Sequence, residues 1–336
     1  TTDLNIKDDG YLYNNNSSTI NYTDIDWAGG NIVDNGGTFQ LVSGAGDLTI
    51  PIDALLEINV QRTFTNVTVN GILSHSANSS ADTNKLNLIT TGNFTINSTG
   101  SLNVSNKGFS SGYGTGVPIY EDAGASHAGE GGNSSVPGYG SITEPTTLGS
   151  GGLGNNAGTG GGAAKLTIAG DMTITGNISA NGSNGGCGGG YGWYARGGGS
   201  GGSIWISAAN LLGSGNLSAN GGSAVSCYIN TGSGGAGGRI ALYYTGTNSI
   251  TSNQIVAMGG RGGNTGVQKG GAGTIFVKSS SQTYGDLTID NNETTWTSNT
   301  DSYSVTRISS NLTIDSISIS KYARVYNEAT ITTTDL

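Results

Sequence analysis

The sequence predicts an all-β fold, a parallel β-helix or solenoid in which successive coils stack and carry glycine-rich loops. The first observation is a short alternating strand that follows paired glycines and recurs every 35 to 38 residues between Lys165 and Lys278. The second is another short strand, about a dozen residues further on, that closes on Asn-Gly or Met-Gly. The third is the glycine-rich run that leads from each unit to the next. Repeats of fixed period are units that must stack to bury their apolar faces, and a period of two residues within a unit indicates strand.

Stacking should bring equivalent apolar residues of successive units into columns, because parallel coils repeat about every 4.8 Å. We expect four such columns inside the fold. They are Leu166, Ile204, Ile240 and Ile275; Ile168, Ile206, Leu242 and Val277; Ile178, Leu217 and Ile255; and Ala180, Ala219 and Ala257. The outward positions include Trp205 and Phe276, with Tyr243 just after. These aromatic residues predict an exposed interaction surface, unless the glycine-rich segments cover them.

The repeat divides the chain into three parts. Residues 1–46 are polar and poor in strand signals, which is typical of a capping or docking segment. Residues 47–290 form the predicted solenoid, because residues 85–108 already match the later units in order and type. Residues 291–336 are rich in threonine and poor in glycine. We expect them to form a C-terminal β cap, since the last edge of a solenoid would otherwise recruit another strand.

The composition favours a folded, glycine-rich β protein. The chain has 61 glycines and only 10% charged residues, but it spaces its β-branched residues in strict alternation, which disordered chains do not. No run of about 18 apolar residues is present, so we expect no transmembrane segment. The net charge of −9 is uneven, since Asp171 is the only carboxylate between Glu144 and Asp286. Two interpretations of this asymmetry are open: the acidic start and the basic middle pair head to tail between subunits, or both are solvated surface charge. We expect no nucleic-acid partner.

One unit carries a long insertion, residues 109–160. It contains Glu121, Asp122, His127 and Glu130, four of the few titratable side chains in this part of the chain. Insertions in solenoids map to loops on one face and often carry function. The insertion is therefore the candidate ligand site, and the alternative is an ordered but inert flap.

The glycine-rich runs have no side chains to pack. They cover residues 149–162, 182–202, 221–238 and 259–273. As free loops they would lose much conformational entropy on ordering, so stacked rows of extended, polyglycine-II-like backbone are one interpretation and mobile loops the other. A phosphate-cradling role is not indicated, because no helix follows any run.

Two cysteines occupy neighbouring runs. Cys187 lies six residues after Asn181 and Cys227 seven after Asn220, so the repeat stacks them at a distance that a disulfide can span. Such a bridge indicates an oxidising, extracellular setting, and the alternative is a two-ligand metal site. Trp193 and Tyr194 lie between the cysteines and are candidates to contact sugars or a neighbouring subunit.

Asn-x-Ser/Thr sequons are frequent and mildly favour a glycosylated surface protein. The candidate acceptors are Asn66, Asn93, Asn97, Asn177, Asn216 and Asn311.

Residue chemistry argues against an enzyme. Glycoside hydrolysis needs two facing carboxylates, and the repeat core offers only Asp171. A catalytic site would have to be assembled from the four titratable residues of the insertion. We expect no cofactor and no metal site, apart from weak calcium candidates without EF-hand spacing. They are Asp8, Asp9, Asp24 and Asp26.

The segments GGGSGGSIWISAANLLGSGNLSANGGS and GSGGAGGRIALYY resemble the glycine-rich β-helical repeats of large microbial surface proteins, such as adhesins, sheath and S-layer-like components and some phage tail adhesins. The resemblance covers residues 85–290 and implies an extracellular, largely non-catalytic protein. We therefore expect a cell-surface structural protein that assembles with copies of itself into a filament, sheath or array. The alternative is an adhesin that binds glycans or a host receptor through residues 109–160.

Overall fold

The computed structural model describes residues 3–15, 19–20, 24–36, 38–39, 46–189, 193–264, 268–292 and 304–334. Over these residues the chain is all-β, and its one helical element is a single 3-10 turn, η1 (Ser252–Gln254). No helix in the described ranges is long and apolar enough to cross a membrane.

Three large sheets contain most of the strands. The five-stranded sheet consists of β7 (Leu48–Ile50), β10 (Val67–Val69), β13 (Phe94–Ile96), β16 (Asp171–Ile174) and β21 (Asn210–Leu212). The first eight-stranded sheet consists of β2 (Tyr11–Asn14), β5 (Gly30–Asp34), β8 (Ala54–Ile58), β11 (Ile72–Ser74), β14 (Ser101–Asn103), β17 (Asn177–Ser179), β22 (Asn216–Ser218) and β24 (Ile255–Val256). The second eight-stranded sheet consists of β9 (Arg62–Phe64), β12 (Leu86–Thr90), β15 (Ala163–Ile168), β20 (Ser203–Ala208), β23 (Arg239–Tyr244), β25 (Thr274–Ser279), β26 (Asp286–Asp290) and β29 (Ser316–Ser320).

Small two-stranded sheets flank these three. They are β1 (Asp3–Ile6) with β4 (Asp24–Trp27), β3 (Thr19–Ile20) with β6 (Thr38–Phe39), β18 (Cys187–Gly188) with β19 (Tyr194–Ala195), β27 (Thr306–Ile308) with β30 (Val325–Asn327), and β28 (Leu312–Ile314) with β31 (Ile331–Thr333).

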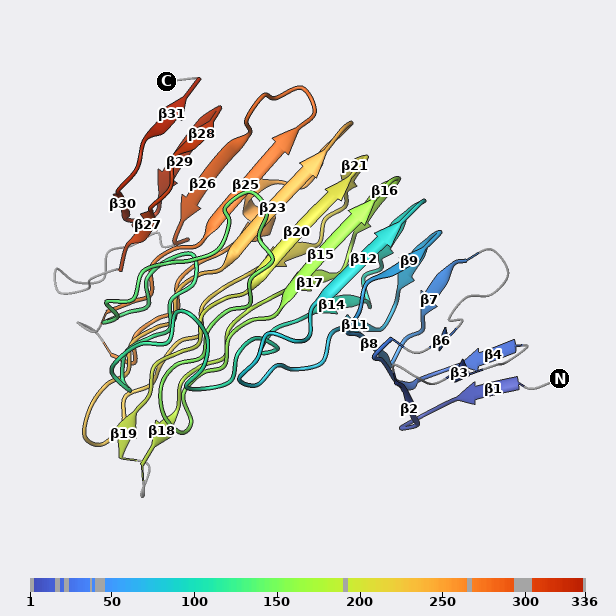
Figure 1. Cartoon of the computed structure of the whole chain (residues 1–336), viewed down its shortest axis with the longest axis horizontal. Helices are drawn as coiled ribbons and strands as arrows, with labels where there is room; N and C mark the ends of the chain where they lie inside the picture. The colour runs from blue at the N-terminus through green and yellow to red at the C-terminus, as the bar shows by residue number, and fades with distance from the viewer. Residues whose placement is uncertain are drawn as a thin grey trace.

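The large sheets are parallel except at the β25–β26 pair, because the chain visits them in turn. After β12 it passes through β13 and β14, and the next visits to the same sheets are β15, β16 and β17, each paired in parallel with its counterpart. The match between residues 85–108 and the later units is thus confirmed by strand pairing. Figure 1 shows the result, a row of side-by-side strands with the N-terminus at one end and the C-terminus at the other.

One continuous apolar core lies between the three sheets, and it contains the predicted columns except Val277, which is half-buried and packs against it. Ile204, Ile240 and Ile275 are directly paired partners in neighbouring strands. The first step of this column differs from expectation, since Ala164 lies opposite Ile204 and Leu166 opposite Ile206. The glycine pair that precedes each strand sets the register, and a shift of two residues keeps the same face inward.

The first 46 residues are richer in strands than their sequence indicated. Strands β2 and β5 extend the first eight-stranded sheet through β8, in parallel register. Ile6 and Ile32 lie in the same core cluster as the central strands. The described part of this segment is therefore packed against the rest of the fold.

The glycine-rich runs and residues 123–132 of the insertion hydrogen-bond backbone to backbone, and together we call them the glycine layer. One row crosses successive repeats, where Gly161 donates to Ser200 O at 2.9 Å, Gly201 to Ala236 O at 2.9 Å and Gly237 to Gly271 O at 3.0 Å. The insertion joins this layer, because Ala125 donates to Gly198 O and Ala236 donates to Ala125 O.

Glycine is required in the layer because a Cβ atom would meet neighbouring backbone. A Cβ placed on Gly222 would lie 1.8 Å from Ser183 O, and one on Gly197 would lie 1.8 Å from Ala123 O. Positive φ is not the reason, because among the described glycines of the four runs only Gly154 and Gly189 have it. Side-chain-free segments therefore approach one another more closely than strands of larger residues can.

The C-terminal strands build a second core on the outer face of the second eight-stranded sheet. The chain reverses after β25, so that β26 pairs antiparallel to it and places Leu287 beside Phe276. Phe276 is only 1% exposed, in a cluster with Ile289, Ile308 and other residues of the C-terminal part. The expectation that Phe276 belongs to an exposed interaction surface is thus corrected.

Candidate binding site

The far end of the glycine layer, which we call the tip, brings together four loops. They are residues 109–122 and 152–157 of the insertion, the hairpin formed by β18 and β19, and residues 225–232. In Figure 1 the hairpin lies at the end of the glycine-rich segments, away from the large sheets.

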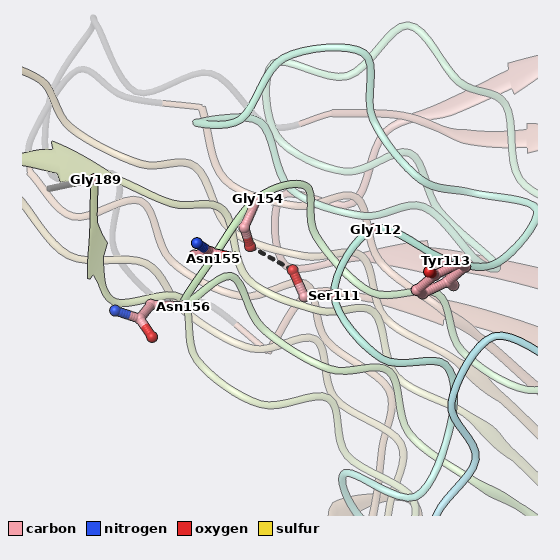
Figure 2. A pocket seen from close by; sticks show the side chains of 7 residues that line it. All are labelled: Ser111, Gly112, Tyr113, Gly154, Asn155, Asn156 and Gly189. Carbon is pink, nitrogen blue, oxygen red and sulfur yellow. Dashed lines mark hydrogen bonds between the residues drawn. The ribbon is translucent and has the colours of Figure 1, made fainter.

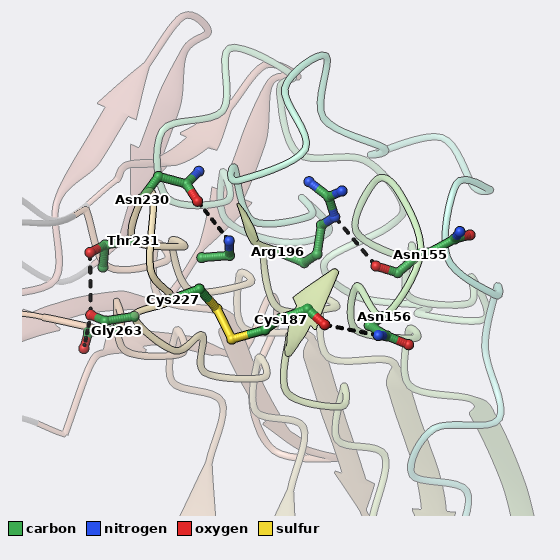
Figure 3. The surroundings of a disulfide bond; sticks show 10 residues. Asn155, Asn156, Cys187, Arg196, Cys227, Asn230, Thr231 and Gly263 are labelled. Atoms are coloured by element: carbon green, nitrogen blue, oxygen red, sulfur yellow. Dashed lines mark hydrogen bonds between the residues drawn. A yellow bond between two sulfur atoms is a disulfide. The ribbon is translucent and has the colours of Figure 1, made fainter. Parts of the chain in front are cut away.

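A disulfide between Cys187 and Cys227 ties the tip together (Figure 3). The two Cα atoms are 5.9 Å apart, within the ordinary range for a disulfide, so the bridge joins the loops of successive sequence repeats. The alternative of a two-ligand metal site is excluded for these residues, since both sulfur atoms are used in the bridge.

Hydrogen bonds between asparagine side chains and the backbone fix the loops around the bridge. Asn156 Nδ2 donates to Cys187 O at 2.9 Å, and the Ala195 N–H donates to Asn230 Oδ1 at 2.6 Å. The hairpin pairs Cys187 with Ala195. Each loop is thus held by its neighbour, which makes the tip a defined surface.

An open groove with a volume of about 700 Å³ lies on one side of the tip (Figure 2). Its lining comes from both ends of the insertion and from the hairpin: Ser111, Gly112, Tyr113, Gly154, Asn155, Asn156 and Gly189. The Tyr113 ring and the Asn155 amide are exposed, and within the described chain neither the Tyr113 hydroxyl nor this amide has a hydrogen-bond partner. The groove therefore offers an aromatic face and free polar groups.

Backbone conformation at the groove is unusual. Gly112, Gly154, Asn156 and Gly189 all have positive φ, between 65° and 91°. Positive φ is sterically costly for a residue with a side chain, as at Asn156, and such outliers gather at ligand sites.

Large apolar side chains are exposed around the groove and over the tip. They are Tyr113, Ile119, Tyr120, Trp193, Tyr194, Val225, Tyr228 and Ile229. The rings of Trp193 and Tyr228 contact each other across two loops, with centroids 5.8 Å apart. Aromatic residues gathered on an exposed surface are typical of a binding site.

Two of the predicted site residues, Glu121 and Asp122, lie at the tip but serve to hold it. Glu121 forms an ion pair with Arg196, whose side chain is almost buried. Asp122 accepts a hydrogen bond from Asn230 Nδ2 at 3.4 Å and, through its carbonyl, one from the Ser233 N–H.

The other two predicted residues of the insertion, His127 and Glu130, lie inside the fold. His127 is fully buried, donates from Nδ1 to Gly201 O at 2.6 Å and accepts at Nε2 from the Thr147 hydroxyl. Burial, with a smaller effect of Arg239, lowers the pKa of His127 to about 3. Glu130 accepts two hydrogen bonds from Arg307. The structure therefore does not bring the four titratable residues of the insertion together.

The predicted outward aromatic residues also face protein. Trp205 lies under the ammonium group of Lys165, 3.9 Å from its ring centroid. The Tyr243 hydroxyl donates to Thr143 O of the insertion, and the Tyr243 ring contacts Phe276 at 5.7 Å between centroids. The insertion thus covers part of this face.

The six candidate glycosylation sites fall into two groups. Asn93, Asn177, Asn216 and Asn311 are exposed. Asn66 and Asn97 are half-buried, and their Nδ2 atoms, which a glycan would occupy, donate to Asp47 and Asn70.

The calcium candidates form no cluster in the described chain. Asp8 and Asp9 are exposed at a turn, and the side chains of Asp24 and Asp26 lie outside the described residues. No group of three or more His, Cys, Asp or Glu side chains suited to a metal ion occurs among the residues that the structure describes.

Sequence reasoning placed the candidate ligand site in the insertion, residues 109–160, which contains Ser111, Tyr113, Asn155 and Asn156, but it chose none of these four as a candidate site residue. The available signal was local, since Tyr113 stands between two glycines and the Asn pair interrupts a glycine run. Comparison of the chain with protein families, curated proteins and solved structures finds no match.

Proposed function

We propose that this chain is an extracellular binding protein whose tip attaches to glycans, with the groove as the contact site. The observation that carries the proposal is the groove itself, with Tyr113 on one wall and Asn155 and Asn156 on the other (Figure 2). No catalytic step is part of the proposal.

The groove chemistry suits a sugar. A pyranose ring has an apolar C–H face that packs on an aromatic ring, and hydroxyls that exchange hydrogen bonds with amide and phenol groups. The Asn155 amide can donate and accept, as can the Tyr113 hydroxyl. Preorganisation by the disulfide and the asparagine hydrogen bonds lowers the entropy lost on binding.

In this proposal the fold is a parallel β-helix with a polyglycine-II-like layer. The support is the order in which the chain visits the sheets, the parallel pairing of equivalent strands, and the backbone hydrogen bonds of the layer. Gly235 illustrates the layer, because it donates to Gly222 O and accepts from the Gly260 N–H. A polyglycine II segment has no internal hydrogen bonds, so each segment must bond to its neighbours. The resemblance to glycine-rich repeats of microbial surface proteins is part of the same proposal.

An extracellular location follows from the disulfide in this proposal, since disulfides persist in oxidising compartments. The exposed sequons Asn93, Asn177 and Asn216 agree with a surface glycoprotein.

The test is binding of the purified protein to a glycan array, followed by titration of the best ligand. We expect saturable binding that falls at least tenfold in the Tyr113→Ala variant, because this change removes the aromatic wall. Tyr284→Ala is the matched control, since Tyr284 is exposed to a similar degree, 41% against 49%, but lies between β25 and β26. Equal loss in both variants, or no glycan bound by the parent protein, would reject the proposal.

Self-assembly is the second candidate function, favoured by the open edges at the C-terminal end. Strands β29, β30 and β31 each have a strand partner on one side only within the described residues, and Ile319 on β29 is 49% exposed. Such edges can pair with a second copy. We expect concentration-dependent polymers by sedimentation and electron microscopy, reduced by Ile319→Lys but not by Ile52→Lys, an exposed isoleucine near the other end. A protein that stays monomeric at high concentration would remove this candidate.

A further inference from the structure

A second cavity, of about 260 Å³, lies between the insertion and the C-terminal strands. Its walls are residues 138–143 on one side, residues 307–312 on the other, and Arg239 of β23. It is separate from the groove at the tip, with which it shares no lining residue.

Arg239 is a buried cation that the fold leaves without a compensating charge. The residue is 3% exposed, and among the described residues no carboxylate lies within ion-pair distance of it. Its hydrogen bonds go to neutral oxygens, from Nε and Nη2 to Tyr139 O and from Nη1 to the Thr274 hydroxyl. A buried, unpaired charge is costly, which is also why burial lowers the pKa of Arg239 to about 10.

The guanidinium retains donors for a ligand. A guanidinium carries five N–H groups, and three of those of Arg239 are used, which leaves one on each of Nη1 and Nη2. Two N–H groups on one guanidinium are suited to the two oxygens of a carboxylate.

The second arginine in the cavity wall is paired with two carboxylates. Arg307 donates from Nε and Nη2 to Glu130 and from Nη1 to Glu328. The two carboxylates offset both arginines in the total, but Arg239 is the arginine of the cavity wall that neither of them pairs with, and a net charge of zero favours a monoanion over a dianionic phosphate. Exposed hydroxyls of Ser309, Ser310 and Ser141 line the mouth and can bond to a polyol.

We propose that this cavity binds a carboxylate-bearing sugar, with the carboxylate on Arg239 and the sugar hydroxyls at the serine-lined mouth. The cavity has room for about nine water volumes at roughly 30 Å³ each, enough for one sugar-sized acid but not for an oligosaccharide. The site does not depend on the groove at the tip, so either proposal can fail while the other stands.

The test is titration of the full chain with D-glucuronate, monitored by isothermal calorimetry or NMR, with D-glucose and inorganic phosphate as comparison ligands under the same conditions. We expect saturable binding of glucuronate and at least tenfold weaker binding of glucose and of phosphate. The proposal would be overturned if the chain bound glucose as tightly as glucuronate. It would also be overturned if the chain bound neither sugar at about 50 mM, which is 50 times a Kd of about 1 mM.

Variants at the mouth avoid disturbing the buried arginine. Ser309→Asp places a negative charge at the opening and should weaken glucuronate binding at least tenfold, whereas the neutral Ser309→Asn should stay within about twofold of the parent. Equal affinities of these two variants would also overturn the proposal. Tyr113→Ala, the variant that tests the tip, should leave glucuronate affinity unchanged, so the two sites are tested independently.

Discussion

Replacing Gly235 by alanine is expected to lower the free energy of unfolding by about 3 kcal/mol or more. A Cβ atom on Gly235 would lie 2.1 Å from Gly199 O and 2.5 Å from Gly199 C. Both are backbone atoms in the middle of the glycine layer, so no side-chain rotation can relieve the overlap. The neighbouring segments would have to separate, and their hydrogen bonds would lengthen together.

Gly186→Ala is the matched control for this substitution. Its Cβ would find the nearest atom, Asn156 O, at 3.5 Å, which is ordinary contact, and its φ is not positive. We expect a change within about 0.5 kcal/mol, measured by urea denaturation of both variants under the same conditions. If Gly235→Ala unfolds with the same midpoint as Gly186→Ala, the layer is not close-packed, and close backbone approach does not explain its glycines.

The sequence predicted the strands and their faces better than their pairing. Ile178, Leu217 and Ile255 pair as the repeat indicates, because each lies at the same distance from an Asn/Met-Gly turn. Leu166 is displaced by two residues from its expected partner, because it stands four residues after its glycine pair, whereas Ile204 stands two residues after its own. An apolar pattern of period two is unchanged by such a shift, so it cannot specify the register.

The sequence could have predicted that the outer face of β25 is buried, but not which strand covers it. Residues 275–277 read Ile-Phe-Val, a continuous apolar run that is typical of a strand buried on both faces. Nothing local to that run says that β26 returns antiparallel and brings Leu287 over Phe276. The groove at the tip was beyond local reasoning for the same cause, since Tyr113 and Asn155 meet only when the two ends of the insertion fold together.

The burial of His127 has a related cause. Its neighbours Ala125, Ser126, Ala128 and Gly129 are all small. Small residues on both sides of a titratable one allow close backbone approach, and in this fold the ring fills the space between neighbouring segments. The imidazole side chain suggested a ligand site, whereas the small neighbouring residues indicated burial. The structure shows that His127 is buried.

Acidification from pH 6.5 to pH 4 is expected to lower the free energy of unfolding by roughly 3 kcal/mol for each of the two histidines. Burial is the main cause that lowers the pKa of His75 to about 4 and that of His127 to about 3, from 6.5 in the unfolded chain. Below pH 6.5, therefore, His75 and His127 bind protons in the unfolded chain but remain neutral in the folded chain. The stabilisation is complete above pH 6.5 and is lost as pH falls toward the folded pKa values.

The hydrogen bonds add a second reason, besides burial, why His75 does not accept a proton readily. Each Nδ1 lies against a carbonyl oxygen, Ser76 O at 2.8 Å or Gly201 O at 2.6 Å, and must carry the hydrogen. Each Nε2 is then the acceptor, from the Ala163 N–H in His75 and from the Thr147 hydroxyl in His127. The hydroxyl can rotate to accept, but a backbone N–H cannot, so protonation of His75 sets two N–H groups against each other.

His75→Gln and His127→Gln separate this effect from a general loss of stability. Glutamine cannot titrate, so each variant should lose about half of the pH dependence between pH 6.5 and pH 4.5, whatever its stability at pH 8. The measurement is urea denaturation at half-unit pH steps, in which the slope, rather than the absolute free energy, reports the protons taken up on unfolding. Because carboxylates titrate mainly below this window, a slope that survives in the double variant would mean that the buried histidines are not the groups that make the fold sensitive to acid.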